Sequence, residues 1–98
     1  GGNIDGPSAG CAITTALISA VTGKAVRQDI AMTGEISIQG LVKPVGGVFE
    51  KAYGARQAGM KGMVIPEENQ RDIPEHHLNL QIYSTRTIEE VLDIMLVK

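Results

Sequence analysis

Ser8 and Lys51 are the residues of this 98-residue chain whose types and settings could do chemistry together. Ser8 follows Pro7, and proline suits the first position of a helix because its φ is preset and it has no N–H. Ser8 therefore falls in a first helical turn, where unpaired backbone N–H groups and the helix dipole stabilise an alkoxide or oxyanion. The structural alternative is an ordinary serine at a helix start, which is the commoner meaning of Gly-Pro-Ser.

Lys51 is the candidate base for that serine. It lies in a predicted helix that is opened by Gly46-Gly47 and closed by Gly59. The apolar stripe of this helix consists of Val48, Ala52 and Ala55, and Lys51 falls in the same stripe. Burial disfavours the charged form of lysine, and a neutral amine can accept the proton of a serine hydroxyl. The alternative is a stem that runs along the apolar surface while the ammonium reaches water.

Other nucleophiles and ligands are less favoured. His76 and His77 are adjacent in a polar turn with no acid placed to orient them, which argues against a Ser-His-Asp triad. No Cys/His spacing predicts a metal site. Cys11 is the single cysteine, so it excludes an internal disulfide, and its apolar helical setting predicts a buried structural thiol.

The elements that must position Ser8 and Lys51 follow from periodicity and turn residues. The first helix, from Pro7 to about Thr22, is apolar nearly all round and is predicted to be buried on most sides. The remaining predicted elements are a strand over 29–38, a turn at Gln39-Gly40, a return strand over 41–45, a helix over 46–58, a strand over 63–65, a helical turn from Pro66, a strand over 78–83 and a helix capped by Thr87 and Glu90. The order α-β-β-α-β-β-α predicts one α/β or α+β domain, in which the β-α-β spacing at 41–65 allows one right-handed crossover.

Composition narrows the choice of partners and compartment. The net charge is −2, there is no basic cluster, and the aromatic residues are one Phe and two Tyr, so nucleic acid is not an expected partner. No apolar run is long enough to span a bilayer and no signal peptide is recognisable, so no membrane partner is expected. Cysteine usage fits a reducing compartment, which is the cytoplasm, or the mitochondrial matrix if a transit peptide has been removed. The start at Gly-Gly without Met suggests a fragment or a processed product.

Four motifs occur in a fixed order along the chain. They are DGPSAG at residues 5–10, MTGEI at 32–36, PVGGVFEK at 44–51 and IPEEN at 65–69. Together they resemble the proteolytic domain of Lon, the ATP-dependent AAA+ serine protease, and the resemblance runs the full length of the chain. The closing TIEEVL at 87–92 is similar to the last helix of that family.

The resemblance implies a Lon-like fold of small mixed sheets packed on helices and a role for each matching residue. Ser8 corresponds to the nucleophile and Lys51 to the general base of a Ser-Lys dyad, which hydrolyses peptide bonds in unfolded or damaged proteins. Thr33 corresponds to a threonine whose hydroxyl can hold the lysine amine. Asp5 corresponds to an acid that either engages Lys51 in the idle site or shapes the turn.

The resemblance also implies a setting for the domain. Residues 1–98 would be the C-terminal portion of a proteolytic domain whose upstream part is absent, acting in a homo-hexamer with an upstream AAA+ module. ATP and Mg²⁺ would bind in that module, because this chain has no Walker A motif, and no cofactor or metal is expected here. The alternatives are a non-catalytic Lon-like oligomerisation scaffold, which Ser8 and Lys51 argue against, and an inactive fragment that assembles into a ring.

Overall fold

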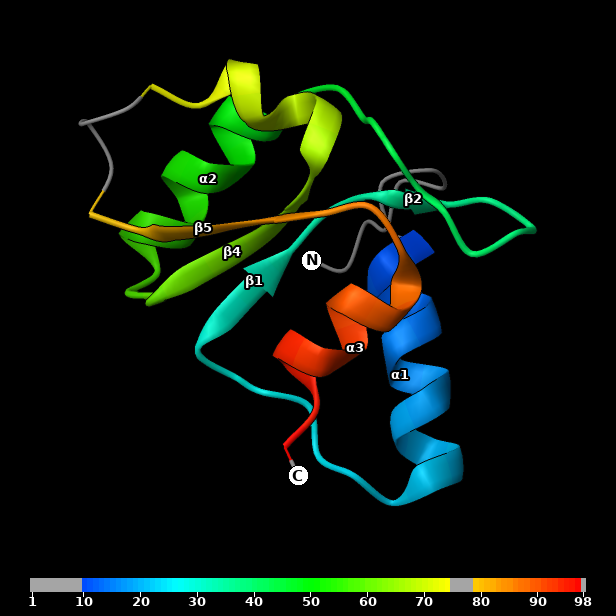
Figure 1. Ribbon diagram of the computed structural model, residues 1–98. Coiled ribbons are helices and arrows are strands. Elements are labelled where there is room, and N and C mark those ends of the chain that lie inside the picture. Colours follow the sequence, from blue (N-terminus) through cyan, green and yellow to red (C-terminus); the bar gives the residue numbers. More distant parts are fainter. Residues whose placement is uncertain (1–9, 75–78, 98) are drawn as a thin grey trace.

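The computed structural model describes residues 10–74 and 79–97, and within them a parallel sheet separates two groups of helices (Figure 1). The sheet has the order β1-β4-β5, and β2 and β3 form a separate antiparallel pair. The elements are α1 (Gly10–Thr22), β1 (Ile30–Met32), β2 (Glu35–Ile36), β3 (Val42–Lys43), α2 (Val48–Gln57), β4 (Gly62–Pro66), the 3-10 helix η2 (Glu67–Asp72), β5 (Gln81–Thr85) and α3 (Ile88–Met95). The predicted α/β class is therefore confirmed.

Strand β4 is the centre of the molecule. All five of its residues are buried, as expected of a strand with parallel partners on both sides and helices on both faces. Its side chains alternate between two hydrophobic clusters. Val64 packs with Cys11, Val91 and other residues on the side of α1 and α3, whereas Met63 and Ile65 pack on the α2 side. Strand β4 thus joins the two halves of the core.

The predicted strand over 29–38 is wrong as a single element. Gly34 has a φ of 144°, a backbone conformation that side chains with a Cβ rarely adopt, and the chain changes sheets there. Before this glycine, β1 pairs with β4; after it, β2 pairs with β3. The predicted turn at Gln39-Gly40 is confirmed, since Gly40 has a φ of 83° between the two antiparallel strands.

Two other predictions about strands are corrected by the sheet. The segment over 41–45 does not form a parallel pair with β4, because the parallel partner of β4 is β1 and the connection between them contains both the hairpin and α2. The last strand is Gln81–Thr85 rather than 78–83. Its position follows from pairing Gln81 with Gly62 and Thr85 with Pro66, which apolar alternation along one segment does not reveal.

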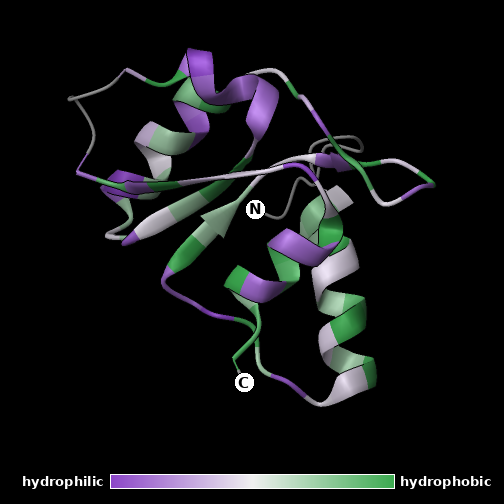
Figure 2. Ribbon diagram, viewed as in Figure 1, coloured by the Kyte–Doolittle hydropathy of each residue, from purple (hydrophilic) through white to green (hydrophobic). Residues whose placement is uncertain are grey.

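Helix α1 is not buried on most sides, contrary to the sequence prediction. Cys11 and Thr15 are its buried residues, whereas Ile13, Leu17 and Val21 are 47%, 62% and 84% exposed. Figure 2 shows α1 coloured mainly white to green along its length. The helix packs on α3 and β2 along one side, so the residues on its opposite side stay accessible in the single chain. Across the described ranges, no helix has both the length and the apolar character needed to cross a membrane.

Helix α3 begins with the predicted capping box. Thr87 Oγ1 accepts a hydrogen bond from Glu90 N–H at 3.3 Å, and the Glu90 carboxylate accepts one from Thr87 N–H at 3.0 Å. Val91 and Met95 of the predicted stripe are buried against the core. The N-terminus of α3 is thus fixed by its own sequence.

We expect Thr87→Ala to loosen the start of α3, because loss of an N-cap costs about 1 kcal/mol. Amide hydrogen exchange in the first turn of α3 should become faster by about fivefold. Thr87→Ser keeps the hydroxyl and serves as the control. Equal protection in Thr87→Ala and Thr87→Ser would show that the cap does not hold this helix.

Candidate active site

The structure brings Thr33 and Lys51 together. Thr33 follows β1 directly, is 2% exposed, and extends the ladder by donating its N–H to Val64 O at 3.0 Å. Lys51 lies in the first turn and a half of α2, and its Nζ donates to Thr33 Oγ1 at 3.4 Å. Two residues from different predicted motifs therefore form one polar pair, and the pair is the candidate active site.

Lys51 itself is exposed, so the prediction that it is buried is wrong. The apolar stripe of α2 is buried at Val48, Ala52 and Ala55, but Lys51 stands at the margin of that stripe. Lys51 is exposed as a residue, and its long stem allows the amine to reach the buried Thr33 hydroxyl. This arrangement also differs from the alternative interpretation, in which the stem follows the apolar surface and the ammonium reaches water.

The first turn of α1 is attached to the strand end that carries Thr33. Cys11 N–H donates to Gly34 O at 2.9 Å, and a Cβ on Gly34 would lie 2.8 Å from Cys11 Sγ. Gly34 is therefore required both by its φ and by this close contact. Ser8 and Asp5 lie outside the described residues, as do the backbone N–H groups around Ser8; in the sequence Ser8 precedes Cys11 by three residues.

Burial of Cys11 has a chemical consequence. The side chain has no exposed surface, and burial raises the pKa of its thiol from the ordinary value of 9.0 to about 11. The thiol is protonated at neutral pH, and a protonated thiol is a poor nucleophile. The prediction that Cys11 is buried is confirmed.

The start of α2 depends on a residue to which the sequence assigned no role. Asn69 lies in η2 and is buried, and its side-chain amide bonds to both main-chain groups of Val45, just before α2. It belongs to the IPEEN motif, but a polar residue after two glutamates looks like part of a solvated turn. A buried asparagine can be recognised only when its distant backbone partner is known.

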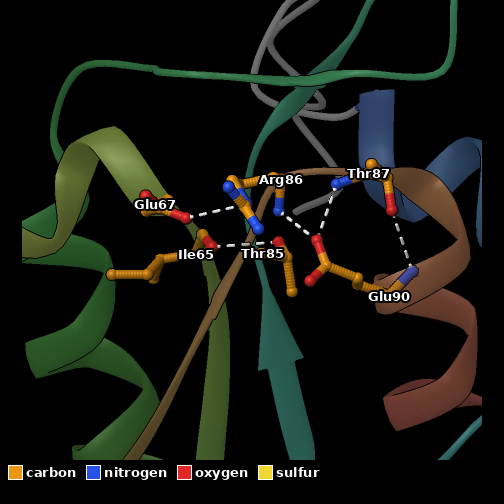
Figure 3. Close-up of polar contacts among 6 residues, drawn as sticks. All are labelled: Ile65, Glu67, Thr85, Arg86, Thr87 and Glu90. Atoms are coloured by element: carbon orange, nitrogen blue, oxygen red, sulfur yellow. Dashed lines mark hydrogen bonds and ion pairs between the residues drawn. The ribbon is translucent and has the colours of Figure 1, made fainter.

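A shallow cavity of about 210 Å³ lies at the ends of β4 and β5, beside β3. Its walls include Glu67 and Arg86, which form an exposed ion pair at 3.1 Å. Figure 3 shows this pair beside the Thr85 hydroxyl, which donates to Ile65 O at 3.0 Å. The same view shows the Glu90 carboxylate, whose pKa is lowered because it accepts the N–H groups of Arg86 and Thr87. Neither Thr33 nor Lys51 lines this cavity.

Metal ligation finds no support in the geometry of the described ranges. Within residues 10–74 and 79–97, no three His, Cys, Asp or Glu side chains are grouped so that they could hold a metal ion. His76 and His77 lie outside these ranges.

Comparison with known proteins identifies the family. Residues 2–98 match the family described as the Lon protease (S16) C-terminal proteolytic domain. The chain belongs to this family. It is 53% identical over 96 residues to the Lon protease of Haemophilus influenzae, 51% identical to that of Erwinia amylovora and 50% identical to that of Escherichia coli K12, in each case over 94% of this chain. The chain spans about 12% of the length of these Lon proteases.

Membership in the Lon proteolytic domain family agrees with the resemblance seen in the sequence. The observed mixed α/β arrangement is consistent with the fold of that family. The matched range includes Ser8, Thr33 and Lys51. The two of these that the structure describes are in contact.

We expect Cys11 to react slowly with iodoacetamide in the native protein. The thiolate is the reactive species, and with a pKa of about 11 instead of 9.0 its population at pH 8 is about a hundredfold smaller. The reaction should become faster as the pH rises toward 11, and unfolding in guanidinium should abolish the protection. Mass spectrometry of the peptide that carries Cys11 measures the rate, and rapid native labelling at pH 8 would contradict this assignment.

Proposed function

We propose that this chain supplies the catalytic residues of a serine endopeptidase that hydrolyses peptide bonds in unfolded or damaged proteins, with Ser8 as nucleophile and Lys51 as general base. The observation that carries the proposal is the contact of Lys51 Nζ with Thr33 Oγ1 at 3.4 Å. Family membership and the printed names of the relatives, which are Lon proteases, support the same activity.

The attachment of α1 supports Ser8 as the partner of Lys51. Cys11 is bonded to Gly34, the residue after Thr33, so the start of α1 lies against the strand end that holds the lysine amine. Three residues of chain span at most about 11 Å. Ser8 lies three residues before Cys11 in the sequence, so the chain limits how far Ser8 can lie from Gly34.

In the proposed mechanism, Lys51 Nζ accepts the Ser8 Oγ proton as the oxygen attacks a peptide carbonyl. The Thr33 hydroxyl accepts a hydrogen bond from the amine and so directs the nitrogen lone pair toward the serine. Backbone N–H groups at the start of α1 are the candidates for stabilising the oxyanion. Lys51 then donates the proton to the leaving amine and activates a water that hydrolyses the acyl-enzyme.

The exposure of Lys51 fits this mechanism if substrate covers the site. A base must be neutral before it can accept a proton, and excluding water from a lysine amine favours the neutral form. A polypeptide lying over Thr33 and Lys51 would exclude water in this way. The bound substrate would thus complete an environment that the single chain leaves open.

The family relationship extends the proposal to the assembly. We propose that residues 1–98 act as the C-terminal portion of a Lon-type proteolytic domain within a homo-hexamer, supplied with unfolded chains by an upstream AAA+ module. ATP and Mg²⁺ would be bound by that module and not by this chain. The proposed compartment is the cytoplasm, or the mitochondrial matrix, without direct nucleic-acid or membrane partners.

The dyad is tested by Ser8→Ala and Lys51→Ala in the complete natural protein that contains these residues. Each substitution should lower the rate of casein cleavage by at least about a thousandfold, because nucleophile and base act as one unit. Lys51→Arg should be equally inactive, since a guanidinium stays charged. Lys24→Ala, at an exposed lysine after α1, is the control. Normal proteolysis by Ser8→Ala or Lys51→Ala would favour the scaffold alternative instead.

Thr33→Val tests the hydroxyl that holds the amine. Valine has nearly the same shape but cannot accept the hydrogen bond, so kcat/KM should fall by about tenfold. Thr33→Ser retains an acceptor and should keep most of the activity. Steady-state kinetics with a fluorogenic peptide provide the measurement. If Thr33→Val and Thr33→Ser are equally active, the hydroxyl has no part in catalysis.

A further inference from the structure

Both polar groups of the Asn69 side chain form hydrogen bonds, although Asn69 lies in a short 3-10 helix. It is 5% exposed, its Oδ1 accepts from Val45 N–H at 3.0 Å, and its Nδ2 donates to Val45 O at 2.9 Å. The second hydrogen of Nδ2 is donated to Asp72 Oδ2 at 2.8 Å. One amide thus satisfies both main-chain groups of Val45, as a neighbouring strand would.

The segment held by Asn69 is one that its own sequence leaves loose. Val45 is followed by Gly46-Gly47, and glycines lose more conformational freedom on folding than other residues. Gly47 precedes α2 with a φ of 70° and provides no side-chain cap. In the described part of the chain, no heavy atom lies within 4 Å of a Cβ built on either glycine. The hydrogen bonds to Val45 therefore anchor the entry to α2.

The position of Lys51 depends on this entry. Lys51 N–H donates to Gly47 O at 3.1 Å, so the first helical bond of the lysine is made to the residue two positions after Val45. At the other end of the side chain, Nζ lies 3.4 Å from Thr33 Oγ1, near the outer limit of a hydrogen bond. A small shift or rotation of α2 would break that contact.

We propose that Asn69 is a positioning residue for Lys51: by clamping both main-chain groups of Val45, it fixes the start of α2 so that the lysine amine stays against Thr33. This inference rests on the proposed function, in which Lys51 is the base. The clamp on Val45 requires an amide at position 69. A carboxylate offers no donor for Val45 O, and an aliphatic side chain offers neither a donor nor an acceptor.

The principal test is Asn69→Ala in the complete natural protein that contains these residues. The expected result is a fall in kcat of at least about tenfold with KM changed by less than about twofold, since the base is displaced while the substrate surface remains. Gln70→Ala, at the exposed neighbour in η2, is the matched control and should leave both constants unchanged. Asn69→Asp keeps the size and one acceptor, and it should show the same selective loss of kcat if Asn69→Ala fails to fold.

A second destabilised variant, Met95→Ala, separates a purely structural role of Asn69 from a positioning role. Met95→Ala removes a buried side chain from the hydrophobic cluster on the side of α1 and α3, so it should lower the melting temperature. When kcat is measured well below that melting temperature, Met95→Ala should leave it unchanged. Gly46→Ala should stiffen the entry to α2, since Gly46 lacks a positive φ and its Cβ would meet no neighbour among the described residues. Gly46→Ala should raise kcat by about twofold to fivefold in Asn69→Ala and leave it unchanged in Met95→Ala.

The outcomes distinguish this inference from the proposed function. If Lys51→Ala is inactive but a folded Asn69→Ala or Asn69→Asp protein keeps its full kcat, the positioning role is wrong and the dyad stands. A loss of kcat no greater than in Met95→Ala, with no rescue by Gly46→Ala, also overturns the positioning role. If Lys51→Ala retains proteolysis, the proposed function and this inference are both wrong.

Discussion

The burial of β4 between two parallel partners is the constraint on which the rest of the structure depends. Full burial of a Val, Ile or Met side chain contributes about 1.5–3 kcal/mol to the stability of the fold. Strand β4 places such side chains on both faces of the sheet. Met63 and Ile65 form the surface on which α2 packs, while Val64 faces the side of α1 and α3. The parallel pairing with β1 then fixes where Thr33 emerges. The distance between Thr33 and Lys51 is thus set by the two elements that β4 holds in place.

Irregular backbone beside this rigid sheet creates the candidate site. Gly34 turns the chain out of β1, accepts the hydrogen bond from Cys11, and leaves no space for a larger residue. On the opposite side, Val45 is held by Asn69 just before α2 begins. The polar pair sits beyond the carboxyl end of β1, where open parallel sheets commonly bind ligands. The packed sheet therefore fixes the elements that carry Thr33 and Lys51, and the glycine-containing connections direct the chain so that these two residues meet.

Two features of the single chain are open to water. The chain spans about 12% of the Lon proteases that it matches, and its α1 carries three exposed apolar side chains on one side. Lys51 is likewise open to water, although its partner hydroxyl is buried. The family relationship and the contact between Thr33 and Lys51 are separate observations, and both support the proposed function.

Local sequence signals determined much of the secondary structure. The capping box fixed the start of α3, the turn at Gly40 joined β2 to β3, and Gly47 and Gly59 bounded α2. Each depends on residues within a few positions of one another, and such short-range preferences can be read along the chain. The ordered motifs also identified the family and drew attention to Thr33 and Lys51 before their contact was known.

Only the tertiary structure decided which distant segments meet. It divided the strand predicted over 29–38 at Gly34, paired β4 with β1, left one side of α1 exposed, and moved Lys51 to the margin of the buried stripe. It also revealed the bonds from Asn69 to Val45, which are 24 residues apart. Sequence periodicity indicates the average polarity of a segment's surroundings, but it does not show which distant segment packs against it. Which strands and helices pack together depends on how the whole core is buried, and that is a property of the folded chain.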